Sequence, residues 1–265
     1  MNLDRKKELL EYLVEGLCAE RGYAVPHAKD AVELWNVFRA LVNTRPPMPA
    51  GSSWLEVQDE LLAGLIEEEG IASVEDGVVC FFDDRIRLRQ GDITTLAADA
   101  IVNAANSQML GCWVPGHYCI DNAIHTFAGV QLRLECARIM DAQGYEEPTG
   151  CAKITAAYNL SSRHVIHTVG PIADGRPTDR HRAQLASCYR SCLELAQENN
   201  LSSIAFCCIS TGVFGFPPRE AAEIAVRTVR EWLDRTGAQI TVVFNVFSNK
   251  DYDIYNDLLF RNKHF

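Results

Sequence analysis

The sequence has no uninterrupted run of about 18 apolar residues, and this excludes an ordinary membrane-spanning helix. Its first residues, Met1–Lys7, lead into an amphipathic pattern instead of the apolar core of a secretion signal. Internal repeats and low-complexity tracts are also absent. We therefore expect a cytoplasmic protein with no membrane contact, unless a signal of another kind directs it elsewhere. We take it to be a monomer, although the sequence does not determine the oligomeric state.

Positive charge is scarce. The chain carries 25 Lys and Arg residues against 35 Asp and Glu residues, which gives a formal net charge of −10. Because non-specific binding of nucleic acid relies on a basic surface, we expect no nucleic-acid partner. The low positive charge does not exclude binding of a phosphate ligand, since backbone N–H groups and helix N-termini can hold one without Lys or Arg.

The ten cysteines do not form a disulfide pattern, because the chain is large and has no secretion signal. Cys207 and Cys208 lie in a strand-like run, and Cys188 and Cys192 share a helical face. Most of the cysteines are therefore expected to be reduced and buried as small apolar residues. Cys112 and Cys119 differ, as described below.

Hydrophobic periodicity divides the chain into two parts. Residues 1–75 have three helical patterns and are predicted to form an N-terminal helical extension. Residues 76–265 alternate strand-like and helix-like segments, which predicts an α/β domain with a mixed central sheet covered on both faces. The expected strands are Arg85–Arg89, Ala100–Asn103, Lys153–Ala156, His164–Thr168, Ile204–Ile209 and Ile240–Val246, and the expected helices are Asp121–Gln143, Arg182–Glu198, Arg219–Asp234 and Asp251–Phe260.

Polar segments follow several of these strands, where ligands bind in sheets of this kind. Gly91–Thr94 contains Asp92, which fits either a capped turn or a ligand contact. Asn103–Asn106 places two amides three residues apart, which suits either a backbone turn or hydrogen bonds to a polyol such as ribose. Ser210–Pro217 combines two glycines with small hydroxyls, and its backbone amides could face a diphosphate, although it is neither a Walker motif nor a Rossmann fingerprint.

The loop Gly111–His125 contains a possible metal site. Cys112, His117 and Cys119 form a Cys-x4-His-x-Cys cluster, and thiolates and imidazole are the ligands that zinc prefers. Three protein ligands leave a fourth position for water or substrate, as in catalytic sites, whereas a structural site would need a fourth ligand that no nearby residue supplies. The alternative is two incidental cysteines and a loop histidine. His125 lies in a helical pattern and is expected to be a packed or helix-bonded histidine.

Taken together, these segments resemble those of macrodomains. Gly91–Thr94, Asn103–Asn106, the Ala123-Ile124-His125 element, His167–Pro171 and Gly212–Pro217 occur in the order of that family, over roughly residues 80–260. The resemblance implies a three-layer α/β/α fold with an ADP-ribose cleft. Ordinary macrodomain hydrolases have a glycine-rich loop before Ala-Ile-His. Here Cys112, His117 and Cys119 replace it, which resembles the zinc-containing branch of microbial protein-ADP-ribose hydrolases with an N-terminal helical extension.

The resemblance also implies roles for individual residues. Asp92 would accept from the adenine amino group with Ile93 beside the ring, and Asn106 would hold the distal ribose with Asn103 behind it. Asp121 would act with Asn106 in catalysis, as general base towards a water or a ribose hydroxyl. Some members carry an acidic residue where Val213 stands, so this loop offers no carboxylate here. The implied ligand-binding residues are Asp92, Ile93, Asn103, Asn106, Cys119, Ile120, Asp121, Asn122, Ser210, Thr211, Gly212, Val213, Phe214, Gly215 and Phe216.

We therefore expect a zinc-dependent hydrolase that removes mono-ADP-ribose from modified proteins by cleaving an N- or O-glycosyl bond. In the zinc branch the substrate is often a lipoyl carrier protein modified by a partner sirtuin. Zinc could orient the distal ribose and water, or activate the water directly. The alternatives are a non-catalytic reader of ADP-ribosylated proteins, a hydrolase of a small ADP-ribose derivative, and a structural zinc protein without a ligand.

Overall fold

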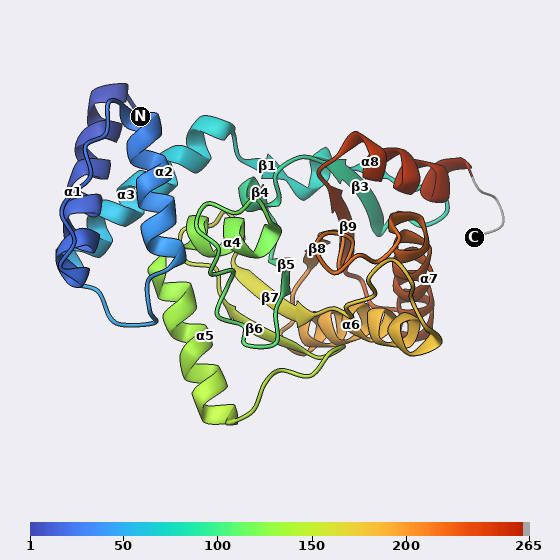
Figure 1. Cartoon of the computed structure of the whole chain (residues 1–265). Coiled ribbons are helices and arrows are strands. Elements are labelled where there is room, and N and C mark those ends of the chain that lie inside the picture. Colours follow the sequence, from blue (N-terminus) through green and yellow to red (C-terminus); the bar gives the residue numbers. More distant parts are fainter. Residues whose placement is uncertain (262–265) are drawn as a thin grey trace.

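A computed structural model describes residues 1–261 and has a seven-stranded mixed sheet at its centre (Figure 1). The strand order is β2-β3-β9-β8-β5-β7-β6. The five inner strands run parallel, while β2 and β6 pair antiparallel at the two edges. The strands are β2 Val78–Val79, β3 Ile86–Gln90, β5 Ala100–Ala105, β6 Ala152–Ala156, β7 His164–Val169, β8 Ser203–Phe206 and β9 Thr241–Val246.

Helices cover both faces of this sheet, which explains why its inner strands are apolar on both sides. Helices α6 (Asp179–Glu198) and α7 (Pro218–Thr236) pack against each other below the sheet in the view of Figure 1, and α8 (Asn249–Asn256) lies above it. Helix α4 (Ile120–Ala128) packs on β5, and α5 (Val130–Gln143) follows it. A mixed sheet flanked by helices confirms the predicted α/β fold.

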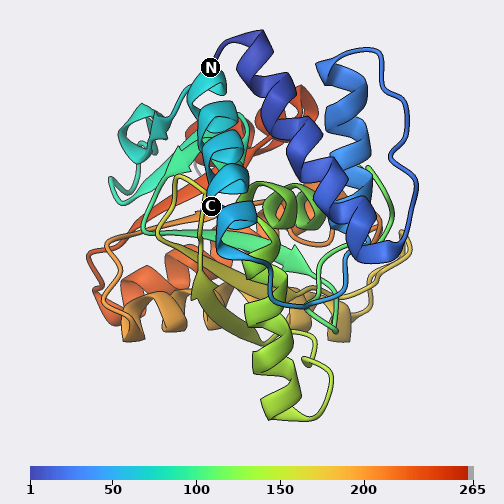
Figure 2. The same cartoon turned by 90° about the vertical axis from the view of Figure 1, so that its left-hand side faces the viewer.

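The N-terminal segment forms three helices with a hydrophobic core of their own. They are α1 (Leu3–Arg21), α2 (Ala31–Asn43) and α3 (Ser52–Glu69). Asn2 caps α1 and Asp30 caps α2 through side-chain acceptors, as expected at helix N-termini. Figure 2 shows the three helices on the side of the molecule that carries α4 and α5. The predicted boundary at residues 75–76 falls within a short 3-10 turn, Val74–Asp76, and stays a prediction.

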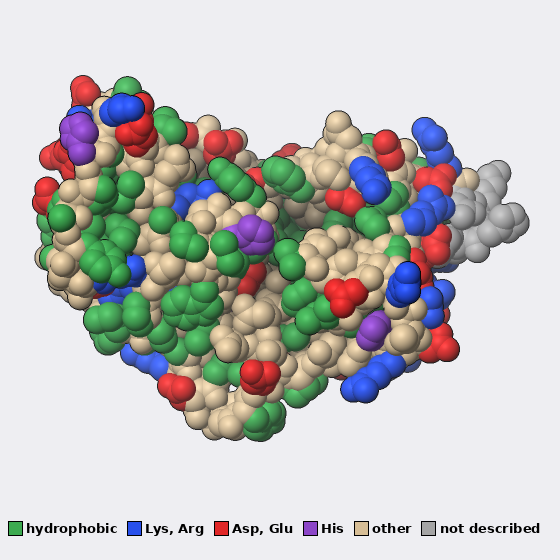
Figure 3. Space-filling model, in the orientation of Figure 1, with side chains coloured by type: hydrophobic (Ala, Val, Ile, Leu, Met, Phe, Trp, Pro, Cys, Tyr) green, Lys and Arg blue, Asp and Glu red, His purple; other side chains and the backbone are tan. Residues whose placement is uncertain are grey.

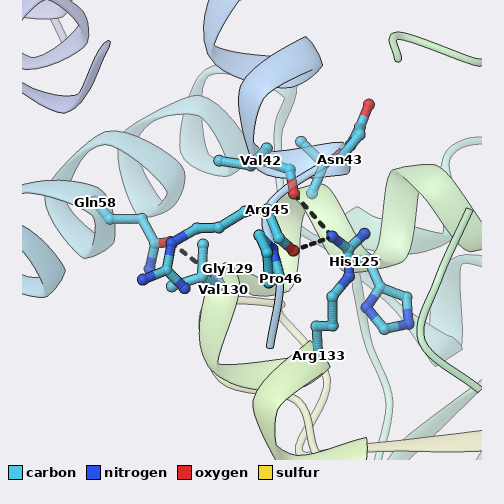
Figure 4. A pocket seen from close by; sticks show the side chains of 10 residues that line it. Val42, Asn43, Arg45, Pro46, Gln58, His125, Gly129, Val130 and Arg133 are labelled. Atoms are coloured by element: carbon cyan, nitrogen blue, oxygen red, sulfur yellow. Dashed lines mark hydrogen bonds between the residues drawn. The ribbon is translucent and has the colours of Figure 1, made fainter. Parts of the chain in front are cut away.

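Buried polar groups attach these helices to the rest of the chain (Figure 4). Gln58 of α3 is fully buried, and its Oε1 accepts from the Val130 backbone N–H at 2.9 Å. Arg133 of α5 donates through Nη1 to the carbonyl oxygens of Val42 (3.1 Å) and Arg45 (2.7 Å). Since a buried polar group costs free energy unless it is paired, these contacts fix one arrangement of the two parts. Within residues 1–261 no helix is long and apolar enough to cross a membrane.

Several elements differ from the prediction. Helix α6 begins three residues earlier than expected, and α8 spans Asn249–Asn256 instead of Asp251–Phe260, because a π-helical turn, Asp257–Arg261, follows it. The expected helix Asp121–Gln143 is broken at Gly129, whose φ is +95°, so α4 and α5 are separate helices. Strand β8 ends at Phe206, three residues earlier than expected, because the chain turns towards the cavity described below. Two-residue strands at Ala72–Ser73 (β1) and Leu96–Ala97 (β4) pair in parallel, and their length gives no periodic signal in the sequence.

Candidate functional site

A cavity of about 900 Å³ opens outside the carboxyl ends of the five parallel strands. Figure 3 shows this face hollowed near its centre, with hydrophobic side chains around the hollow. Segments after β3, β5, β7, β8 and β9 line it, together with two side chains of α2. This position agrees with the rule for parallel α/β sheets, and the volume suits a ligand the size of a dinucleotide.

Most of the residues chosen from the sequence meet in this cavity. Those that line it are Asp92, Ile93, Asn106, Cys112, His117, Cys119, Ile120, Asp121, Ser210, Thr211, Gly212, Val213 and Phe214. Four others lie outside its lining. Asn103, Asn122 and Phe216 are at most 1% exposed, and Gly215 lies behind the loop against Asp174. These four can support the cavity wall but do not reach its interior in this structure.

The loop after β3 presents a carboxylate to one end of the cavity. Asp92 Oδ1 accepts from Thr94 N and Thr94 Oγ1, both at 2.8 Å, and so caps the 3-10 turn Ile93–Thr95. Its Oδ2 has no hydrogen-bond partner within residues 1–261. The Asn245 amide on β9 holds the loop by donating to the Gly91 carbonyl at 2.9 Å. Asp92 therefore serves as a cap and still offers a free acceptor.

The loop after β8 offers free hydrogen-bond donors. Gly215 N donates to the Gly212 carbonyl at 3.0 Å and Phe216 N to the Ser210 carbonyl at 2.9 Å, which curls the loop. The amides of residues 212–214 donate no hydrogen bond within the described chain. Ser210 has a φ of +64°, and its buried Oγ also has no partner among residues 1–261. Such a row of amides is suited to an anion.

Asp121 lies in the first turn of α4, where two amides fix its carboxylate. Asn103 Nδ2 donates to Oδ1 at 2.8 Å, and Asn106 Nδ2 donates to Oδ2 at 3.3 Å and to the Gly111 carbonyl at 3.1 Å. Burial raises the pKa of Asp121 to about 6, and the hydrogen bond from Asn103 opposes the rise. The residue is 6% exposed and lines the cavity. A held carboxylate in this setting can take or give a proton.

Behind Asn103 lies a buried histidine. His167 of β7 accepts from Asn103 Nδ2 through Nδ1 at 3.1 Å, and its Nε2 lies 3.0 Å from Thr155 Oγ1. Burial lowers the pKa of His167 to about 3, so the ring is neutral. The neutral ring, with its proton on Nε2, satisfies both contacts and orients the Asn103 amide towards Asp121.

Cys112, His117 and Cys119 come together at the wall of the cavity next to Asp121. Their possible ligand atoms all lie within 4.8 Å of one another, and Cys112 Sγ is 3.5 Å from His117 Nδ1. A tetrahedral zinc ion with ordinary Zn–S and Zn–N bonds would hold S and N roughly 3.6 Å apart. The donor set and its spacing therefore fit zinc. All three residues line the cavity, so a metal ion that they held would lie at its wall.

A second group, His125, Cys136 and His167, has comparable spacing but fits packing better than metal binding. All three are buried, and both ring nitrogens of His167 are already engaged. Burial raises the pKa of Cys136, which disfavours the thiolate. His125 lies against the loop that carries the candidate ligands, since a Cβ at Gly111 would come within 2.8 Å of its ring. Its burial agrees with the packing role expected from the sequence.

Sequence reasoning missed two sources of lining residues. Phe247, Ser248 and Asp251 follow β9, and the rule that found the other loops would have found them too. Trp35 and Arg39 come from α2, and no local pattern in the sequence connects that helix to the cavity.

Comparison with known proteins places the chain among close relatives. The Macro domain family matches residues 102–225. A protein-ADP-ribose hydrolase of Treponema medium is 51% identical, covering 97% of this chain and 98% of its own. One from Staphylococcus aureus is 47% identical, with 98% of each chain covered. A Trypanosoma brucei macrodomain solved with ADP-ribose is 32% identical, has a TM-score of 0.62 and covers 83% of this chain and 94% of its own.

Proposed function

This chain belongs to the macrodomain family, and from that premise we propose that it binds ADP-ribose and hydrolyses its bond to a modified protein. The observation that carries the proposal is the position of Asp121. It faces a dinucleotide-sized cavity, is held by two amides, and lies beside the Cys112–His117–Cys119 cluster. Relatives that are named protein-ADP-ribose hydrolase and match nearly the full chain support the hydrolase assignment.

The free groups of the cavity suit the parts of ADP-ribose in order. Asp92 Oδ2 would accept from the adenine amino group, and Ile93 would pack beside the ring. The unpaired amides of residues 212–214 and the Ser210 hydroxyl would hold the diphosphate. The distal ribose would then lie against Asp121 and Asn106.

In the reaction, a water oxygen bonds to the anomeric carbon of the distal ribose as the bond from that carbon to the protein side chain breaks. Asp121 takes a proton from the water or from a ribose hydroxyl, and the departing side-chain atom gains one. Asn103 and Asn106 keep the carboxylate oriented throughout. A zinc ion held by Cys112, His117 and Cys119 would supply Lewis-acid polarisation of an oxygen at this end of the cavity.

The substrate proposal extends to the protein that carries the ADP-ribose. The resemblance to the sirtuin-linked branch favours a lipoyl carrier protein that a partner sirtuin has modified. Exposed side chains at the cavity mouth, among them Tyr118, Val213 and Phe247, give such a protein an apolar surface to contact.

Replacement of Asp121 tests the proposed chemistry. Asp121→Ala is expected to lower kcat for ADP-ribose release by at least about 100-fold, because the proton acceptor is lost, while the dissociation constant for ADP-ribose changes by less than about fivefold. Release from a mono-ADP-ribosylated protein is followed over time, and ADP-ribose binding by calorimetry. Asp141→Ala, an exposed carboxylate on α5, is the control.

Three outcomes would contradict the proposed activity, substrate class or role of Asp121, respectively. If the wild-type chain binds ADP-ribose but never releases it from protein, it is a reader. If it acts on small ADP-ribose esters or phosphates and leaves modified proteins intact, the substrate class is wrong. Equal losses of binding and turnover in Asp121→Ala would reduce Asp121 to a binding residue.

A further inference from the structure

Helix α2 of the N-terminal segment contacts the loop that carries the candidate metal ligands. Arg39 and Asn43 are four residues apart, so they project from the same face of α2. Both are buried, although polar side chains of this kind are usually exposed. Their partners explain the burial, because each bonds to the loop or to the helix that follows it.

Asn43 holds the loop on the N-terminal side of His117. Its Oδ1 accepts from the Gly116 backbone N–H at 3.0 Å. Its Nδ2 donates to Thr126 Oγ1 on α4, also at 3.0 Å. One amide therefore links α2, the loop and α4.

Arg39 holds the loop on the other side of His117. Its Nη2 lies 3.3 Å from the His117 carbonyl oxygen and 3.1 Å from Asn122 Oδ1. The guanidinium carbon lies 5.1 Å from the centroid of the Tyr118 ring, within cation–π range. The Asn122 backbone N–H in turn donates to Cys119 Sγ at 3.4 Å. Arg39 thus contacts the backbone of one candidate ligand and is one residue removed from another.

Helix α2 is itself firmly fixed. Arg133 donates to the carbonyl of Val42 in the last turn of α2 and to that of Arg45, two residues beyond the helix, as Figure 4 shows. Its guanidinium carbon lies 4.3 Å from the Trp113 ring centroid. Trp113 follows the remaining candidate ligand, Cys112. All three candidate ligands are therefore flanked by residues that contact α2 or its anchor.

From these contacts we infer that Arg39 and Asn43 are positioning residues, which hold His117 and Cys119 in the geometry that binds zinc. The inference rests on the proposed zinc site. The N-terminal helices would then contribute to metal binding, since α2 orients the loop that carries Cys112, His117 and Cys119 although it is not part of the macrodomain sheet. Groups that orient metal ligands typically alter metal affinity 10–100-fold when they are replaced.

Zinc affinity of full-length variants tests the inference without relying on activity. Arg39→Lys keeps the charge but loses the guanidinium fork, and Asn43→Ser keeps a buried polar group but shortens it. Each is expected to bind zinc about 10–100-fold more weakly than wild type in competition with a chromophoric chelator. Arg21→Lys, within the N-terminal helices, and Asn36→Ser, exposed on α2, are the matched controls and should bind zinc as wild type does.

Thermal unfolding of the metal-free variants serves as the check on folding, because Arg39 lines the cavity and ADP-ribose affinity would not report folding alone. Unfolding midpoints close to that of wild type, together with weakened zinc binding, support the inference. Zinc affinity within about threefold of wild type in both folded variants, or loss of zinc only in variants that no longer fold, overturns it. If the wild-type chain itself takes up no zinc, the proposed metal site is wrong and the inference fails with it. If the wild-type chain binds zinc and both variants bind it equally well, only the inference is wrong.

Discussion

At the scale of single residues, the cavity floor depends on a chain of neutral hydrogen bonds. Thr155, His167 and Asn103 connect in series and end on the Asp121 carboxylate. Sequence reasoning identified Asp121 and Asn103 but gave His167 no role beyond family resemblance. The contact between His167 and Asn103 joins residues 64 positions apart, and no local pattern encodes it.

Buried neutral histidines should make the fold sensitive to acid. The pKa of His167 is about 3 in the folded protein, whereas an unfolded histidine titrates near 6.5. As the pH falls below about 6.5, His167 takes up a proton in the unfolded chain but stays neutral in the folded one. The free energy of unfolding therefore decreases by about 1.4 kcal/mol per pH unit. Burial also lowers the pKa of His125, so its contribution to stability is lost in the same direction as the pH falls. His167→Gln should reduce the slope by about one proton.

Denaturant unfolding between pH 7.5 and 5 measures this slope for wild type and His167→Gln at matched zinc content. The exposed His27 provides a control, because His27→Gln should leave the slope unchanged. Identical slopes for wild type and His167→Gln would contradict the proposed neutral, buried state of this ring.

At the scale of elements, the sequence predicts strands and strand-end loops well because both are local. Apolar runs such as β7 and β9 form where expected, and the loops after β3, β5 and β8 meet as the parallel-sheet rule requires. The helix expected over residues 121–143 is broken at Gly129, whose φ of +95° favours glycine. A Cβ there would also come within 2.5 Å of Gln58 Nε2, so the contact with the N-terminal helices is a second reason for glycine at this position.

The loop after β8 should depend on a glycine that lies behind it. Gly215 has a φ of +65°, and a Cβ there would lie 3.2 Å from the backbone of Asp174. Gly215→Ala combines left-handed strain of roughly 1–2 kcal/mol with a close contact, so the 212–214 amides should shift. We expect ADP-ribose binding to weaken by about tenfold in calorimetry, because 1.4 kcal/mol corresponds to a factor of ten.

Gly144→Ala is the matched control for this loop. Gly144 also has a positive φ, +77°, but a Cβ there meets nothing within 4 Å, and it caps α5 away from the cavity. Gly144→Ala should lower stability and leave ADP-ribose affinity as in wild type. Equal affinities for the two variants would show that the strained loop does not set the position of the amides.

At the scale of the whole molecule, two cores share one functional cavity. The macrodomain supplies the sheet-end loops, and the N-terminal helices supply Trp35 and Arg39 to its wall. Both parts were predicted from the sequence, but no role for the N-terminal helices could be. Their contacts with the loop that carries the candidate ligands join residues more than 70 positions apart. The structure therefore adds Trp35 and Arg39 to the residues that line the cavity, and it shows that Arg39 and Asn43 contact the loop that carries the candidate ligands. Local sequence patterns could not reveal these contacts.

We propose that this cavity hydrolyses protein-linked ADP-ribose with a zinc ion on Cys112, His117 and Cys119. Time-resolved release of ADP-ribose from a mono-ADP-ribosylated protein tests it most directly, with zinc-loaded enzyme, chelator-stripped enzyme and folded Cys119→Ser compared side by side. We predict that stripping removes most of the activity, that added zinc restores it, and that Cys119→Ser is not restored. Full release by metal-free enzyme would contradict the claim.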